Sequence, residues 1–257
     1  MFVDTHAHLY SEKFDDDRLS VLENAKDQGI EAIYLPNIDS GTIESMHRLE
    51  QDSSYYCKAM MGLHPCSVRS DYERELDIVH SWLSQRSYSA IGEIGTDLYW
   101  DKTTFDWQAA AFVQQVKWAY EYSMPIVIHC RESVKETIGL LENNSQWITG
   151  GIFHCFSGDP EDAKKVIDMG YYLGIGGPVT YKKSMLREVV REIGLEHLVL
   201  ETDAPYLPPV PHRGSRNESA YIPLVAATIA GIKDCGLDEV ASVTTTNAYK
   251  IFSQSAS

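Results

Sequence analysis

The sequence predicts an α/β protein with the (β/α)8 architecture of a TIM barrel. Its 257 residues are a typical length for one such barrel. Short apolar runs rich in β-branched and aromatic residues alternate with segments of helical spacing, which indicates parallel strands joined by helical crossovers. Eight such runs occur, and no Pro/Gly/Ser-rich linker or block of charge divides the chain. We therefore expect residues 1–257 to form a single domain.

The eight expected strands are the apolar runs themselves. They are Phe2–His8, Ala32–Ile38, Cys57–His64, Ala90–Gly95, Ile126–His129, Gly151–His154, Tyr171–Gly176 and Leu198–Asp203. Between them, residues such as Leu19, Leu22 and Ala25 recur at the spacing of one helix face. A last helical segment opens near Ser219 and carries apolar residues such as Ile222. We expect it to be an extra C-terminal helix that packs against the outside of the barrel.

Histidines and carboxylates lie at the expected ends of these strands, where TIM barrels have their active sites. His6 and His8 are two residues apart in the first strand, so their side chains point to the same side. Two neutral imidazoles directed at one point can share a metal ion. The other strand-end residues are His64, Glu93, His129, His154, Glu201 and Asp203. Because five of the nine histidines occupy such positions, the sequence predicts a metal site.

The formal net charge of −15 argues against tight, extended binding to phosphate backbones. Metal ions and a few Arg or Lys side chains in a pocket can still reverse the local field. No apolar run approaches the roughly 18 residues that span a membrane, and cleavage of a signal peptide would remove His6 and His8. The five cysteines include no CxxC pair. We expect a cytoplasmic protein with reduced cysteines and without a membrane or an obligate protein partner.

Six motifs occur in order along the chain. They are DTHAHL, GLHP, GEIGTDLYW, IHCRE, FHCFSG and ETDAPYL. Together they resemble the TatD family, metal-dependent hydrolases with an amidohydrolase-like barrel that are described mainly as deoxyribonucleases. The HRG…NE segment at residues 212–218 extends the resemblance. The family's NEP triplet reads Asn217-Glu218-Ser219 here, and we expect this departure to loosen the loop.

The resemblance implies a site for two divalent metal ions. The ligands that it implies are His6, His8 and Asp203 for one ion, His129 and His154 for the second, and Glu93 as a bridge between them. An anionic bridge offsets the repulsion between two cations, and ions about 3.5–4 Å apart can stabilise both the attacking and leaving oxygens of a phosphodiester. We expect Mg²⁺ or Mn²⁺ to support turnover, while the imidazoles can also bind Zn²⁺.

The expected catalytic residues are Asp203, Glu93 and His64. Asp203 can orient the attacking water and accept its proton, in addition to binding metal. By resemblance, His64 has a position on the substrate side of the site, where it binds phosphate or protonates the leaving group. Glu201 lies two residues before Asp203 on the same face. It is expected either behind the ligands, as a group that orients them, or in a purely structural role.

Two arginines are candidate phosphate contacts. Arg131 follows His129 by two residues and offers a bidentate fork to phosphate. Arg213 lies in the loop after the last strand, where barrels often bind phosphate, although a salt bridge within the loop is an equal alternative. Tyr99 and Trp100 can either stack on a base or pack at the rim, and the sequence does not choose between these roles.

By resemblance, the function is cleavage of phosphodiester bonds in DNA by water. The expected activity is that of a 3′→5′ exonuclease that prefers single-stranded ends. An alternative is an ester or amide hydrolase, such as an aminoacyl-tRNA deacylase or a small-molecule amidohydrolase, because a two-metal site polarises a carbonyl as readily as a phosphoryl group. A non-catalytic metal-binding partner protein is disfavoured, because every expected ligand is present. A monomer is the default oligomeric state.

Overall fold

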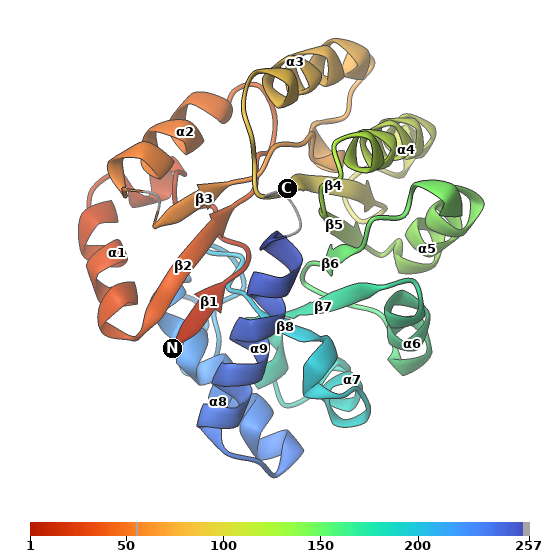
Figure 1. The fold of residues 1–257 in the computed structure, drawn as a ribbon. Helices are drawn as coiled ribbons and strands as arrows, with labels where there is room; N and C mark the ends of the chain where they lie inside the picture. The colour runs from red at the N-terminus through yellow and green to blue at the C-terminus, as the bar shows by residue number, and fades with distance from the viewer. Residues whose placement is uncertain (55, 254–257) are drawn as a thin grey trace.

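Parallel strands surrounded by helices make up the fold (Figure 1). The computed structural model describes residues 1–54 and 56–253. Within them, the eight strands are β1 (Phe2–Asp4), β2 (Ile30–Leu35), β3 (Cys57–Ala59), β4 (Ile91–Asp97), β5 (Ile126–Arg131), β6 (Gly151–Phe153), β7 (Tyr171–Ile175) and β8 (Leu198–Leu200). Strands β1 to β3 form one ladder and β4 to β8 form a second, both in sequence order.

Two junctions join these ladders into a barrel. Between β3 and β4, Met61 pairs with Ile91 in an isolated parallel bridge. Between β1 and β8, Ala7 pairs with Ala204 in the same way. The predicted (β/α)8 fold is confirmed, with the ladders connected by single bridges at these two places.

Helices cover the outside of the strands (Figure 1). They are α1 (Arg18–Asp27), α2 (Ile43–Asp52), α3 (Tyr72–Gln85), α4 (Phe105–Glu121), α5 (Val134–Asn143), α6 (Pro160–Asp168), α7 (Leu186–Glu192) and α8 (Ile222–Lys233), while a further helix, α9 (Leu237–Phe252), lies across one end of the barrel. Residues at the start of α6 explain why the helix begins there. Asp159 accepts hydrogen bonds from two backbone N–H groups and Asp162 completes a capping box, while Pro160 occupies the first helical turn.

Several strands end earlier than the sequence predicts. β1 ends at Asp4 instead of His8, and β8 ends at Leu200 instead of Asp203. The chain beyond β1 leaves its ladder and bonds alternately to its neighbours: Ala7 N–H donates to the carbonyl of Tyr34. The residues over the barrel mouth are therefore extended but do not belong to a continuous ladder. A pattern of apolar residues does not show where the ladder ends.

The C-terminal segment forms two helices where the sequence suggested one. Asp234, in the left-handed conformation, ends α8, and α9 starts after Gly236. Helix α8 packs beside α7, on the outside, whereas α9 lies across the middle of the barrel (Figure 1).

Among the described residues, no single helix is long and apolar enough to cross a membrane. Only the two segments 219–233 and 237–252, taken together as a bent pair, reach that length and apolar character.

Helix α9 closes one end of the barrel with apolar side chains. Eight residues that lie in the strands or directly next to them form an inner cluster: Val3, Ala32, Tyr34, Met60, Ala90, Val127, Ile152 and Val199. Three residues of α9 complete it, namely Ala248, Ile251 and Phe252. The rings of Phe252 and Tyr34 stack with their centroids 3.6 Å apart. The helix expected on the outside of the barrel is α8, whereas the sequence reasoning did not anticipate α9, because helical periodicity shows an apolar face but not the surface that covers it.

Replacement of Phe252 by alanine tests this closure. Because the ring is buried in the inner cluster, we expect Phe252→Ala to lower the free energy of unfolding by about 3 kcal/mol. Urea denaturation followed by circular dichroism measures the change. Ser253→Ala, at the exposed next position, is the control and should shift stability by less than about 0.5 kcal/mol. Equal stability of the two variants would contradict the role of α9.

Candidate metal centre

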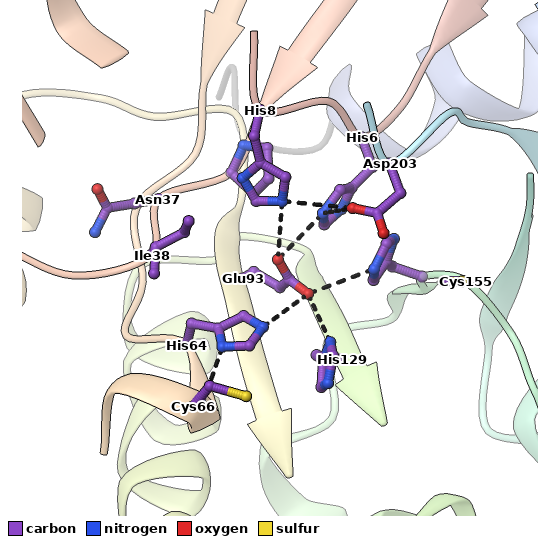
Figure 2. A network of polar contacts seen from close by, with 12 residues as sticks. His6, His8, Asn37, Ile38, His64, Cys66, Glu93, His129, Cys155 and Asp203 are labelled. Atoms are coloured by element: carbon purple, nitrogen blue, oxygen red, sulfur yellow. Dashed lines mark hydrogen bonds and ion pairs between the residues drawn. The ribbon is translucent and has the colours of Figure 1, made fainter. Parts of the chain in front are cut away.

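The six predicted ligands converge above the C-terminal ends of the strands. Figure 2 shows His6, His8, Glu93, His129 and Asp203 turned toward one another. Each comes from a different strand or the segment just after it, except the first two, which share one. They are His6 and His8 after β1, Glu93 in β4, His129 in β5, His154 after β6 and Asp203 after β8. The barrel therefore brings together residues that lie up to about two hundred positions apart in the chain.

Glu93 lies at the centre of this cluster. Its Oε2 atom is 3.1 Å from His6 Nε2 and 3.5 Å from His8 Nε2. Its Oε1 atom is 2.9 Å from His129 Nδ1 and 3.4 Å from His154 Nε2. One carboxylate oxygen thus faces each pair of histidines, which is the arrangement that a bridging ligand requires.

Local backbone features of β4 help direct Glu93 inward. The register of β4 against β5 shifts between Gly92 and Ile94, so that Glu93 is the extra residue of an irregular pairing. The backbone N–H of Glu93 instead donates to the carbonyl of Asn37, after β2. Irregularities of this kind re-aim a side chain next to active sites.

Asp203 completes the group on the side of the first two histidines. Its Oδ1 atom is 3.5 Å from His8 Nε2 and 3.9 Å from His6 Nε2. The backbone of Asp203 has a φ of 58°, a left-handed conformation that aspartate tolerates better than most residues. The ligand atoms of His6, His8 and Asp203 all lie within 4.8 Å of one another, and so do those of His6, Glu93 and His154.

The hydrogen-bond partners of the histidines suit metal binding. The Tyr10 hydroxyl donates to the Pro36 carbonyl at 2.6 Å, so it accepts the bond from His8 Nδ1 at 2.9 Å. That bond leaves an unshared electron pair on His8 Nε2, which faces the oxygens of Glu93 and Asp203. An electron pair directed at carboxylate oxygens is repelled unless a cation lies between them. The donor set therefore fits a divalent cation.

In His129, a carboxylate likewise fixes which ring nitrogen carries the proton. His129 Nε2 donates to Asp97 Oδ2 at 2.8 Å, which leaves Nδ1 to face Glu93. Asp97 Oδ1 accepts the backbone N–H groups of Tyr99 and Trp100, both at 2.9 Å. Burial raises the pKa of Asp97, but these hydrogen bonds outweigh it and lower that pKa to about 2. Asp97 is therefore an ionised partner that fixes the tautomer of His129.

Asp97 is the residue of this centre that the sequence reasoning missed. A signal was available, because Asp97 follows Glu93 by four residues in one strand and so lies on the same face. The strand was expected to end at Gly95, two residues too early to include it.

Glu201 lies behind His154 and is fully buried. Its Oε1 atom is 3.1 Å from His154 Nδ1 and accepts the backbone N–H of Cys155 at 2.6 Å. A side chain at Gly174 would have its Cβ only 2.2 Å from Glu201 Oε2, so β7 needs glycine there. The structure thus places Glu201 where it can orient His154, one of the two roles that the sequence left open.

The electrostatic field of the centre attracts cations. Burial lowers the pKa of His154, but the charges of Glu201 and Glu93 outweigh it and raise that pKa to about 10. Burial raises the pKa of Glu93, but the charges of His64, His6 and His154 hold it well below its usual value. A field that stabilises a proton on an imidazole also favours a metal ion, which competes with that proton for the same nitrogen.

His64 lies beside Glu93 and His129 (Figure 2). Its Nδ1 atom accepts the backbone N–H of Cys66 at 3.0 Å, which leaves the ring proton on Nε2, 3.4 Å from Glu93 Oε1. Burial lowers the pKa of His64, yet the charge of Glu93 outweighs this effect and the pKa is raised. His64 is thus a hydrogen-bond donor that faces the centre.

The two candidate arginines lie in different surroundings. The guanidinium of Arg131 is 3.7 Å from the ring centroid of Tyr99, in the turn that Asp97 holds beside His129. The guanidinium of Arg213 is 4.4 Å from the ring of Tyr181, in the segment after β7. Both side chains are exposed. Arg131 thus contacts the turn that is hydrogen-bonded to Asp97 beside the metal centre, whereas Arg213 contacts the segment after β7.

The loop at residues 212–218 is held firmly, contrary to the expectation that the NES triplet loosens it. Asn217 is fully buried, and its side chain donates to the carbonyls of Thr202 and Tyr206, both at 2.7 Å. Ser219 replaces the family's proline, and its hydroxyl donates to Asp4 Oδ2 at 2.6 Å. The departure therefore adds a buried hydrogen bond that ties the loop to β1.

A barrel with a histidine–carboxylate cluster at the C-terminal face defines the class of metal-dependent hydrolases. The family described as TatD related DNase matches residues 3–253, and the chain belongs to this family. It is 39% identical to the uncharacterized metal-dependent hydrolase YabD of Bacillus subtilis (strain 168), over 98% of this chain and 99% of that one. It is 32% identical to the 3′-5′ ssDNA/RNA exonuclease TatD of Klebsiella pneumoniae (strain 342), over 88% of each.

Solved structures agree with this assignment. The crystal structure of YjjV, a TatD homolog from Escherichia coli K12, superposes with a TM-score of 0.90 at 30% identity and covers 98% of each chain. The predicted family and the prediction of a metal-dependent hydrolase are both confirmed.

Loss of the Asp97 carboxylate tests its hold on His129. We expect Asp97→Ala to weaken metal binding about 10- to 100-fold, because partners behind a ligating histidine contribute to metal affinity on this scale. Isothermal titration of the metal-free protein with Mn²⁺ measures the affinity. Asp101→Ala is the matched control, since the Asp101 carboxylate bonds Thr103 in the next turn. Unchanged affinity in Asp97→Ala would show that His129 needs no such partner.

Proposed function

We propose that the protein is a divalent-metal-dependent phosphodiesterase that removes nucleotides from the 3′ ends of single-stranded DNA. The observation that carries this proposal is Glu93, whose two oxygens each face one pair of histidines. A relative that carries the name 3′-5′ ssDNA/RNA exonuclease supports the choice of polarity and substrate.

In this proposal, the centre would hold two divalent ions. His6, His8 and Asp203 would hold one, His129 and His154 would hold the second, and Glu93 would serve both. Bound there, the ions supply activation of water and neutralisation of the negative charge on the phosphodiester. We expect Mg²⁺ or Mn²⁺ to support turnover, although four imidazoles also bind Zn²⁺.

Two side chains of the centre handle protons. Burial raises the pKa of Asp203, but the neighbouring histidines His8, His154 and His6 outweigh it and lower that pKa. Asp203 is therefore ionised at neutral pH, and it accepts the proton of the attacking water. His64 presents its Nε2 proton toward the centre and donates it to a phosphate oxygen or to the leaving group.

Substrate contacts extend from the centre along the barrel mouth. Arg131 binds a phosphate next to the reacting one through its planar fork, and Arg213 contacts the chain further away. On the other side of the centre, a cleft of about 540 Å³ starts at His8 and Tyr206 and gives the substrate room. Because the protein carries a net charge of −15, binding is local and depends on the metal ions.

Cleavage of labelled single-stranded DNA tests the function directly. With Mg²⁺ or Mn²⁺, we expect a ladder that shortens from the 3′ end of a 5′-labelled oligonucleotide, and no products in EDTA. Asp203→Asn should lower the rate by at least about 100-fold, since it removes the proton acceptor, whose contribution is typically 10²–10⁴-fold. Gel analysis of time courses measures both.

The outcomes separate the candidate functions. Shortening from the 5′ end would overturn the polarity but keep the nuclease. No cleavage by metal-loaded wild type would overturn the nuclease and favour an ester or amide substrate, because the same centre can polarise a carbonyl. Full activity of Asp203→Asn would remove Asp203 from the chemistry.

Two further variants separate metal binding from substrate binding. Glu93→Ala removes the proposed bridge, so we expect the metal content after dialysis to fall below that of the wild type. Arg131→Ala should leave the metal content unchanged and raise the KM for DNA about tenfold, the size of one charge-assisted hydrogen bond. Elemental analysis and steady-state kinetics measure these effects. Full metal content in Glu93→Ala would exclude Glu93 as the bridge.

A further inference from the structure

An exposed pair of aromatic rings lies in the turn after β4. Tyr99 is 47% exposed and Trp100 is 69% exposed. Their rings contact edge to face, with centroids 5.0 Å apart. Two large aromatic side chains side by side on the surface leave apolar area in water, and such places are often binding sites.

This turn is anchored to the metal centre by two hydrogen bonds in series. The backbone N–H of Trp100 donates to Asp97 Oδ1 at 2.9 Å, and Asp97 Oδ2 accepts from His129 at 2.8 Å. His129 in turn lies 2.9 Å from Glu93. Because Asp97 is buried, the aromatic turn has a fixed position next to a proposed metal ligand.

The guanidinium cation of Arg131 contacts both aromatic rings. The guanidinium of Arg131 is 3.7 Å from the Tyr99 centroid and 5.5 Å from the Trp100 centroid. Arg131 is paired with Asp97 in the register of β4 and β5, so the three side chains form one surface, the Tyr99–Trp100–Arg131 surface. Arg131 lies closer to Tyr99, and Trp100 is the more exposed of the two rings.

A cleft adjoins this surface at Trp100 and Asp97. It has a volume of about 450 Å³, and its lining includes Trp100, Asp97, Arg69 and Thr104. This volume is within the range of sites that hold small molecules, about 300–1,000 Å³. A planar heterocycle placed there can contact the indole of Trp100 and the hydrogen-bonding groups of the cleft together.

We infer that the Tyr99–Trp100–Arg131 surface is a nucleobase subsite, in which Trp100 stacks on a base beside the scissile phosphate and Arg131 holds an adjoining phosphate. The inference rests on the proposed nuclease function. Stacking suits this chain in particular, because its net charge of −15 repels phosphate backbones. Stacking supplies affinity without relying on positive charge, and it accepts any base because every base has a π-face.

The test compares two single-stranded oligonucleotides with Mn²⁺ as the metal. One has natural bases, and the other has abasic tetrahydrofuran residues at its four 3′-terminal positions. On natural DNA, Trp100→Ala should raise KM about tenfold with little change in kcat, and Trp100→Phe should recover most of the loss. On abasic DNA, the wild type and Trp100→Ala should have equal KM values. Fluorescence anisotropy with Asp203→Asn and Asp203→Asn/Trp100→Ala should give the same difference in Kd.

Tyr120→Ala is the matched control. Tyr120 is 53% exposed near the end of α4, before β5 begins and so at the opposite end of the barrel, and its loss should leave KM unchanged. Equal effects of Trp100→Ala on natural and abasic DNA, or no effect on either, would overturn the subsite and leave the nuclease standing. No cleavage of either oligonucleotide by metal-loaded wild type would overturn the nuclease and the subsite with it. Unchanged metal content in Trp100→Ala shows that the centre itself is intact.

Discussion

The structure depends on one buried carboxylate that histidines from separate strands must share. Glu93 is 2% exposed and has a histidine nitrogen within 3.5 Å of each oxygen. A buried charge is costly unless it is paired, so the centre is stable only when the strand ends close around it. Closure of the barrel therefore brings the histidines to Glu93, and their pairing with Glu93 offsets the cost of burying its charge.

The seam between the first and last strands shows how closure is fixed. Asp4, fully buried, accepts hydrogen bonds from the backbone and hydroxyl of Thr202 and from the hydroxyl of Ser219. These hydrogen bonds fix the position of β1 relative to the segment after β8. They thereby fix the positions of His6 and His8 relative to Asp203. At the opposite end, α9 fills the barrel with apolar side chains. One end is closed by packing alone, which leaves the other free to carry polar groups.

The histidines of the centre are oriented by partners behind them. Tyr10 bonds His8, Asp97 bonds His129, and Glu201 lies against His154. In His8 and His129, this hydrogen bond fixes the proton on one ring nitrogen. The other ring nitrogen, which has an unshared electron pair, then faces Glu93. Asp97 also bonds the turn that carries Tyr99 and Trp100, so the same carboxylate connects the centre with the rim.

The sequence by itself determined the barrel and the convergence of its ligands. Alternating apolar runs and helical spacing are local properties, and parallel strands necessarily end at one face, so His6, Glu93 and Asp203 could be brought together without coordinates. The tertiary structure decided what depends on distant neighbours. It placed α9 across one end of the barrel, paired Asp97 with His129, gave Ser219 a hydrogen bond to Asp4, and brought the guanidinium of Arg131 against the ring of Tyr99. A sequence pattern shows which face of an element is apolar or polar, but the partner of that face is chosen only when all the strands have closed.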